Sequence, residues 1–255
     1  MLRDIWLALR REQTLALRNP AWIGIGIMQP ILYLVLFGPL MEKIVDNTPG
    51  FPPGNAWVIL TPALILQLGL FSMFAGFGIL ADLRNGALER MRVTPMRRMA
   101  LLLGKVLNAA IQLLVQALLI LVVALIFFDL NPPSFGGVVL SLLIVVLLGI
   151  ALASASYALA LIMRSEEAFL PALNTVLLPV LLLSGILIPI TTGLAPGWLY
   201  AISRANPFTH IMDADRAAFR GDMTVDGLLT GSLVLVAMTA LTVWWGARTF
   251  QRENA

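Results

Sequence analysis

The distribution of apolar and charged positions divides the chain into six long uncharged stretches joined by short charged segments. The stretches are 19–41, 47–81, 106–128, 130–163, 168–203 and 227–247, and the shortest has 21 residues. About 20 apolar helical residues cross the ~30 Å hydrocarbon core of a bilayer, because an α-helix rises about 1.5 Å per residue. The pattern therefore predicts an all-α membrane protein with six transmembrane helices, near 22–41, 57–81, 103–128, 138–163, 169–190 and 228–245.

Two further segments carry a different pattern. In 1–19, apolar residues recur at helical spacing beside arginines, which predicts an amphipathic helix lying in the membrane interface, with a short soluble cap as the alternative. Residues 191–222 are too polar for a span, yet contain the short apolar run 198–202. This favours an outer re-entrant hairpin of one or two short helices between spans five and six. No second domain is expected within 1–255.

Composition supports the membrane assignment and excludes several kinds of site. Charged residues make up 12% of the chain, about half the ~25% usual in soluble domains, and the mean hydropathy is +0.90. The chain has no cysteine and one histidine, His210, so disulfides and cysteine or multi-histidine metal sites are excluded and no metal site is predicted. The net charge of +3 is interpreted as an excess of basic inner loops and not as a nucleic-acid surface.

The positions of the basic residues favour one orientation of the six spans. With the N-terminus inside, 13 of the 17 Lys and Arg residues fall in the inner segments 1–20, 81–105, 163–168 and 248–255. The other four are Lys43, Arg204, Arg216 and Arg220. Because inner loops are enriched in Lys and Arg, we expect both termini to face the cytoplasm.

The six uncharged stretches offer no charged side chain with which to drive transport by ion coupling. No phosphate-binding G-x-x-x-x-G-K-[ST] motif is present either, because Gly104-Lys105 is followed by valine and lacks the preceding glycine. We therefore expect no cofactor in this chain. If the protein moves a molecule uphill, the energy has to come from another chain.

Amides are the main polar groups of the spans. Asn108, Gln112 and Gln116 follow one another at intervals of four residues, on one face of span three. With Gln67 and Asn174, they are candidates for lining a substrate pathway. The alternative is that these amides only hold helices together by interhelical hydrogen bonds.

Two segments have an unusual order of residues. The predicted inner loop carries the pattern E-R-x-x-x-T-P-x-x-R at 89–98, which a merely basic loop does not explain. The outer region contains L-S-G-I-L-I-P at 183–189, L-A-P-G-W-L at 194–199 and N-P-F-T-H-I-M-D-A-D-R at 206–216. Four motifs in this order, at this spacing from the spans, closely resemble the ABC-2 type permease family, and in particular its daunorubicin-resistance-type exporters. His210 and Ala195 depart from the usual family pattern, which often has tyrosine at the first position.

The resemblance implies a half-transporter. Two such chains would form a homodimer, each docking one of two copies of a cytoplasmic subunit that binds ATP and Mg²⁺, in a bacterial plasma membrane. Residues 82–97 would form the coupling helix, with coupling residues Asp82, Arg84, Glu89, Arg90, Arg92, Thr94 and Pro95. The outer gate would contain Ser184, Gly185, Pro189, Asn206, Pro207, His210, Asp213 and Arg216.

The expected substrate is a hydrophobic or amphipathic small molecule moved outward, drug-like or lipid-like, because the spans are apolar with few amides. Export of a polysaccharide or glycolipid is the alternative within the same superfamily. From other classes, a membrane enzyme using His210 with Asp213 or Asp215, or a passive channel, also has to be considered. Neither a nucleophile nor a metal set accompanies His210.

Overall fold

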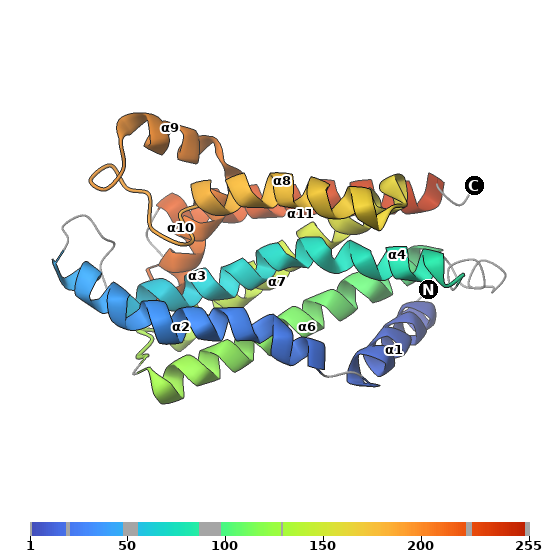
Figure 1. Ribbon diagram of the computed structural model, residues 1–255, viewed down its shortest axis with the longest axis horizontal. Coiled ribbons are helices and arrows are strands. Elements are labelled where there is room, and N and C mark those ends of the chain that lie inside the picture. Colours follow the sequence, from blue (N-terminus) through green and yellow to red (C-terminus); the bar gives the residue numbers. More distant parts are fainter. Residues whose placement is uncertain are drawn as a thin grey trace.

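The computed structural model describes residues 2–18, 21–47, 56–86, 98–128, 130–222 and 226–252, and every regular element in these ranges is a helix (Figure 1). The elements are α1 (Leu2–Arg18), α2 (Ala21–Asn47), α3 (Ala56–Phe71), η1 (Ser72–Gly76), α4 (Phe77–Arg84), α6 (Arg98–Phe127), α7 (Phe135–Met163), α8 (Glu166–Leu183), α9 (Gly197–Ala205), α10 (Pro207–Arg220) and α11 (Asp226–Arg252).

Six helical segments are long and apolar enough to cross a membrane, which confirms the predicted number. They are Gly24–Val45, Ala56–Arg84, Met99–Phe127, Phe135–Met163, Glu166–Leu183 and Asp226–Gln251. The expected limits of span five, 169–190, are wrong. Its helix begins after Ser165, whose hydroxyl accepts a hydrogen bond from the Ala168 amide, and it ends where Gly185 adopts φ +71°, a conformation that favours glycine.

The core of the bundle lies around α3 and α7. Every residue of α3 from Ala56 to Leu70 is buried, and α7 packs against α11, α10, α6 and η1. Small residues permit these close approaches: a Cβ on Gly246 of α11 would lie 2.9 Å from the Ser154 carbonyl oxygen of α7. Backbones that approach this closely increase van der Waals contact between helices in a bilayer.

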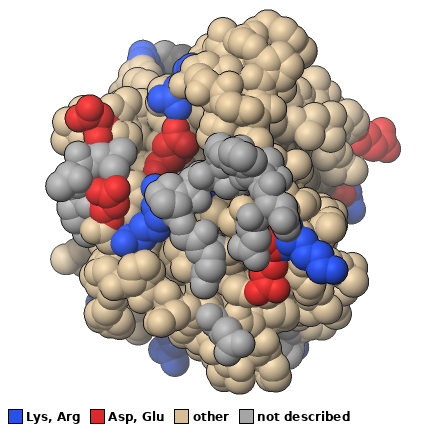
Figure 2. All heavy atoms as spheres, turned by 90° about the vertical axis from the view of Figure 1, so that its left-hand side faces the viewer, with Lys and Arg blue, Asp and Glu red and all other residues tan. Residues whose placement is uncertain are grey.

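The two ends of the bundle differ. Both chain termini, α1 and α4 lie at one end, here called the terminal end, whereas α9 and α10 lie at the opposite end, the α9 end (Figure 1). An even number of spans requires this arrangement of the termini. Figure 2 shows the α9 end, where acidic and basic side chains are interspersed over a largely uncharged surface. That the terminal end faces the cytoplasm remains a prediction from the charges.

The region 191–222 contains the two short helices α9 and α10. Helix α9 is largely exposed, whereas α10 is packed against α11, α7 and α3 and buries most of its residues. The close contact with α11 depends on Gly231, where a Cβ would lie 2.1 Å from the His210 carbonyl oxygen. The predicted dip of this region into the outer leaflet stays a prediction.

Candidate functional site

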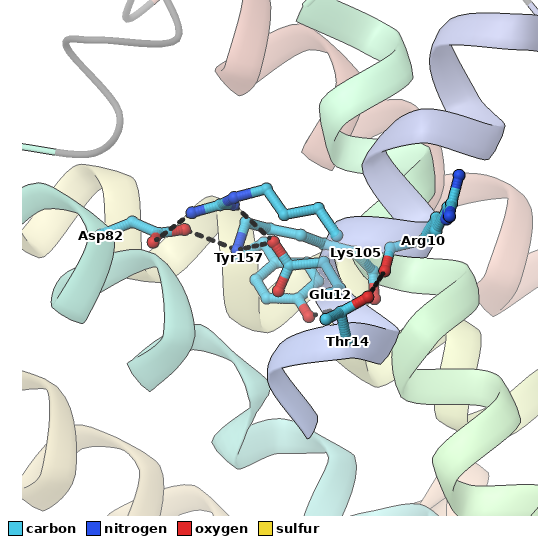
Figure 3. A network of polar contacts seen from close by, with 7 residues as sticks. Arg10, Glu12, Thr14, Asp82, Lys105 and Tyr157 are labelled. Carbon is cyan, nitrogen blue, oxygen red and sulfur yellow. Dashed lines mark hydrogen bonds and ion pairs between the residues drawn. The ribbon is translucent and has the colours of Figure 1, made fainter. Parts of the chain in front are cut away.

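At the terminal end, Lys105 is the buried centre of a charge cluster whose other members are partly exposed (Figure 3). Its Nζ lies 2.6 Å from Asp82 Oδ2 and 3.1 Å from Glu12 Oε1, and the residue is only 6% exposed. Arg11 adds a second cation, with Nη1 2.9 Å from Glu12 Oε1 and Nη2 3.6 Å from Asp82 Oδ1. Charges out of water are costly unless they are paired, so this cluster fixes the relative positions of the helices that carry it.

The charge cluster joins three helices around the predicted coupling helix 82–97, of which Asp82 is the first residue. Asp82 lies in the last turn of α4, which precedes residues 87–97, and Lys105 lies two turns into α6, which follows them. Helix α1 reaches the cluster because Gly104 lacks a side chain: a Cβ there would lie 2.5 Å from Ala8 Cβ. A movement of α4 or of α6 would therefore be transmitted to α1.

The structure describes two of the seven predicted coupling residues. Asp82 belongs to the charge cluster, and Arg84 forms an ion pair of 2.6 Å with Glu166 at the start of α8. The others, Glu89, Arg90, Arg92, Thr94 and Pro95, lie outside the described residues. Sequence reasoning missed Glu12 as a partner of Lys105. The available signal was one lysine directly before an uncharged stretch, which in a membrane calls for a counter-ion.

The second span is interrupted near its middle. Residues Ser72–Gly76 form the 3₁₀ segment η1, which separates α3 from α4. The Ser156 hydroxyl of α7 accepts a hydrogen bond from the Gly76 amide at 2.8 Å and donates one to the Met73 carbonyl oxygen. Irregular backbone at membrane depth is tolerated where protein groups satisfy it, and such 3₁₀ breaks often mark functional hinges. The sequence prediction of one continuous helix over 57–81 missed this break.

Beside η1 lies a cavity of about 400 Å³ between α2, α3 and α6. Its polar lining comes from Gln29, Ser72, Gln112 and Gln116, and Phe71 and Phe74 supply aromatic walls. Within the described part of the chain, none of the residues lining it is charged. The volume falls in the range of small-molecule sites, roughly 300–1,000 Å³.

The five candidate pathway amides are not brought together in one place. Gln112 and Gln116 line the cavity, whereas Asn108 accepts a hydrogen bond from Gln13 Nε2 of α1 at 3.0 Å. Gln67 is buried within α3, and Asn174 is exposed on α8. Gln29 of α2 also lines the cavity, although it was not among the five predicted pathway residues. Any role in transport remains a prediction for all of them.

At the α9 end, side chains of α10 and its N-cap donate hydrogen bonds to backbone carbonyl groups at and just after the end of α8. Asn206 Nδ2 donates to Val180 O at 3.3 Å, and Thr209 Oγ1 donates to Leu183 O at 2.9 Å. Arg216 Nη2 donates to Gly185 O at 2.8 Å, with Ile186 O at 3.4 Å. The last four carbonyls of a helix lack partners within it, so this motif acts as a cap supplied by another helix.

The remaining predicted gate residues have structural contacts. Ser184 donates to Leu181 O at 2.9 Å, and Pro189 is buried. Pro207 is the first residue of α10, after the N-cap Asn206, which accepts from the Phe208 amide. His210 Nε2 lies 3.0 Å from Arg204 O, and Asp213 pairs with Arg204 at 2.6 Å. These contacts tie α10 to α9 and to the end of α8, and a gating function remains a prediction.

Asp215 and Arg216 of α10 are both buried. Ser141 of α7 donates to Asp215 Oδ1 at 2.7 Å. Burial raises the pKa of Asp215 to about 8, against the opposing effects of the Ser141 hydrogen bond and the Arg216 charge. Burial also lowers the pKa of Arg216 to about 10. Helix α10 lies outside the six candidate spans.

Because the pKa of Asp215 is raised, folding should weaken as the pH rises. The unfolded carboxyl group ionises around pH 3.8, whereas the buried one keeps its proton to about pH 8, so the stabilisation is lost progressively across this window. Thermal unfolding of the purified protein should occur at a lower temperature at pH 8 than at pH 5. Asp215→Asn should flatten this dependence, and Asp213→Asn, at a carboxylate that is 42% exposed, should preserve it. Equal pH dependence in wild type and Asp215→Asn would contradict the assignment.

The fold and these features define a class: a polytopic helical membrane protein with an uncharged intramembrane cavity, a break in its second span and a charge cluster at one end. The family is shown by comparison with known sequences. The chain belongs to the ABC-2 type transporter family, whose model matches residues 3–219.

Curated relatives are distant but align over most of the chain. It is 25% identical over 216 residues to the putative transport permease ycf38 of Cyanophora paradoxa, covering 84% of this chain and 73% of that one. It is also 25% identical over 238 residues to the daunorubicin resistance ABC transporter permease protein DrrB1 of Streptomyces coeruleorubidus, covering 90% and 79%. It is 22% identical over 214 residues to the probable multidrug ABC transporter permease YbhR of Escherichia coli, covering 83% of this chain and 57% of that one.

Proposed function

We propose that this chain is the membrane-spanning subunit of an ATP-driven exporter and moves a hydrophobic or amphipathic small molecule outward. The observation that carries the proposal is the charge cluster around Lys105, which ties α1 to both helices that flank residues 87–97. A cytoplasmic ATPase bound to that loop could move α4 and α6 together with α1. The family relationship supports this assignment.

The energy source proposed is a separate ATP-binding subunit, with ATP and Mg²⁺ held there. The six uncharged stretches carry no group for ion coupling, and the sequence lacks a phosphate-binding loop. We further propose two copies of this chain and two of the ATPase, in the plasma membrane of a bacterium. The names of DrrB1 and YbhR, a daunorubicin-resistance and a probable multidrug permease, support drug-like export over polysaccharide or glycolipid export.

Reversing two charges in the predicted coupling loop tests the proposal. The double variant Glu89→Lys with Arg90→Glu should lower co-purification of an ATP-binding subunit encoded beside this chain, or separate ATP hydrolysis from transport. A loss of at least about tenfold is expected, because each reversed charge would then face a like charge on the ATP-binding subunit. Co-purification and ATP-dependent uptake into inverted vesicles are the measurements.

The matched control is Lys43→Glu with Glu42→Lys, which reverses two adjacent charges at the α9 end of α2. It should leave association with the ATPase unchanged. Normal association and normal transport in the Glu89 and Arg90 double variant would overturn the coupling assignment. Uptake that needs no ATP in the wild type would instead favour a passive channel.

A further inference from the structure

The intramembrane cavity continues into a second depression along the surface of α2. The cavity beside η1 and a groove of about 450 Å³ on α2 share Ile25 and Gln29. The groove extends from Ile25 to Phe37 and is lined almost entirely by apolar side chains. At about 1.5 Å per residue, this stretch of helix is about 18 Å long.

The two parts have different chemistry. The cavity presents the amide groups of Gln29, Gln112 and Gln116, which can both donate and accept hydrogen bonds, together with the Ser72 hydroxyl. The groove presents side chains such as Met28, Leu32 and Leu36, which are 57%, 48% and 67% exposed. A molecule occupying both would have a polar group at one end and an apolar body along α2.

We propose that this joined surface is a lateral entry site for an uncharged amphiphile. Its hydrogen-bonding head group would bind the amides of the cavity, and its apolar chain or ring system would lie along α2. The inference rests on the proposed export function and specifies the substrate class, because the described residues lining the cavity include no charge to neutralise a charged head group in the low dielectric of the membrane.

The close approach of α2 and α6 makes the site sensitive to one methyl group. A Cβ on Gly26 would lie 2.5 Å from Gln116 Nε2, so a side chain there must displace the amide. Gly24, on the preceding part of α2, has no atom within 4 Å of a Cβ position. The pair Gly26→Ala and Gly24→Ala therefore separates an effect on the cavity from an effect of alanine on the helix.

Binding can be measured without transport. The permease, co-purified with its ATPase in phosphatidylcholine nanodiscs and without ATP, would be titrated with three pyrene-labelled probes of equal chain length. One probe is an uncharged monoacylglycerol, one a fatty-acid anion and one an alkyl trimethylammonium cation. Energy transfer from tryptophan to pyrene reports occupancy.

The uncharged probe should bind saturably and at least about tenfold more tightly than either charged probe. Gly26→Ala should weaken it about tenfold and Gly24→Ala should leave it unchanged. Gln29→Leu, at an exposed position that does not threaten folding, should weaken it about fivefold, as expected for losing one hydrogen bond. Tighter binding of a charged probe, or equal effects of the two alanine variants, would overturn the proposal.

The absence of cysteine makes one further measurement clean, because Leu32→Cys would be the only thiol of the chain. The uncharged probe should protect this thiol from a membrane-soluble maleimide. Efficient disulfide cross-linking of Leu32→Cys between two copies would show that a second permease covers the groove, and would overturn the entry site. Probe binding without ATP-driven transport would contradict only the proposed function, whereas transport without probe binding would contradict only this inference.

Discussion

Replacing Lys105 with methionine is expected to abolish ATP-driven transport and to lower the unfolding temperature by about 10 °C. The change removes the cation that lies 2.6 Å from Asp82 and 3.1 Å from Glu12. Two carboxylates would then lie near one another, largely out of water, with Arg11 as the remaining basic partner. Breaking a buried ion pair by removing one member costs about 3–5 kcal/mol, because an uncompensated charge stays behind. Thermal unfolding and uptake into inverted vesicles are the measurements.

Two controls separate this effect from a general loss of positive charge. Arg3→Met removes an exposed cation from α1 and should change the unfolding temperature little. A triple variant, Lys105→Met with Asp82→Asn and Glu12→Gln, also removes the stranded charges and should recover much of the lost stability. If stability returns but transport does not, the charge cluster contributes to coupling as well as to folding. An Lys105→Met variant as stable and active as the wild type would refute both roles.

The six spans could be predicted because the bilayer imposes a length and an apolar composition that single residues rarely contradict. The prediction reached the correct number of spans and expected one or two short helices within 191–222, where the structure has two. It failed at the ends of α8, because the end of that helix is set by Gly185 and by caps from a distant segment. It missed η1 because the group that stabilises this break lies far away in the sequence. The Ser156 hydroxyl accepts a hydrogen bond from the Gly76 amide, 80 residues before it.

The candidate sites could be predicted only in part, because contacts between distant segments cannot be read from the pattern within one segment. Periodicity places Gln112 and Gln116 on one face of α6, and the structure places both at the cavity. It cannot show that Asn108, on the same face, is engaged by Gln13 of α1, because that contact depends on how α1 packs. The ion pairs of Lys105 likewise need three helices to meet. Contacts between elements, unlike periodicity within one, require the tertiary structure.

At the opposite end, Arg216→Met is expected to detach the end of α8 from α10 and to abolish export. Arg216 is 5% exposed, and its guanidinium group donates to the carbonyl oxygens of Gly185 and Ile186. Methionine offers no donor, so these carbonyls would lose their partner in a region away from water. Each unsatisfied buried group costs about 1–3 kcal/mol. The unfolding temperature should fall by roughly 10 °C.

Two variants of α10 make this result specific. Arg220→Met removes a half-buried arginine one turn further along the same helix and should cost much less stability. Arg216→Lys keeps the charge but lacks the planar fork, and should lie between wild type and methionine. In the wild type, trypsin should cut at Arg204 of the largely exposed α9 slowly, whereas in Arg216→Met faster cutting is expected, because the turn at 184–186 no longer holds α8 against α10. Unchanged proteolysis and unchanged export in Arg216→Met would mean that Asn206 and Thr209 alone hold the end of α8, and that the last residue of the motif is dispensable.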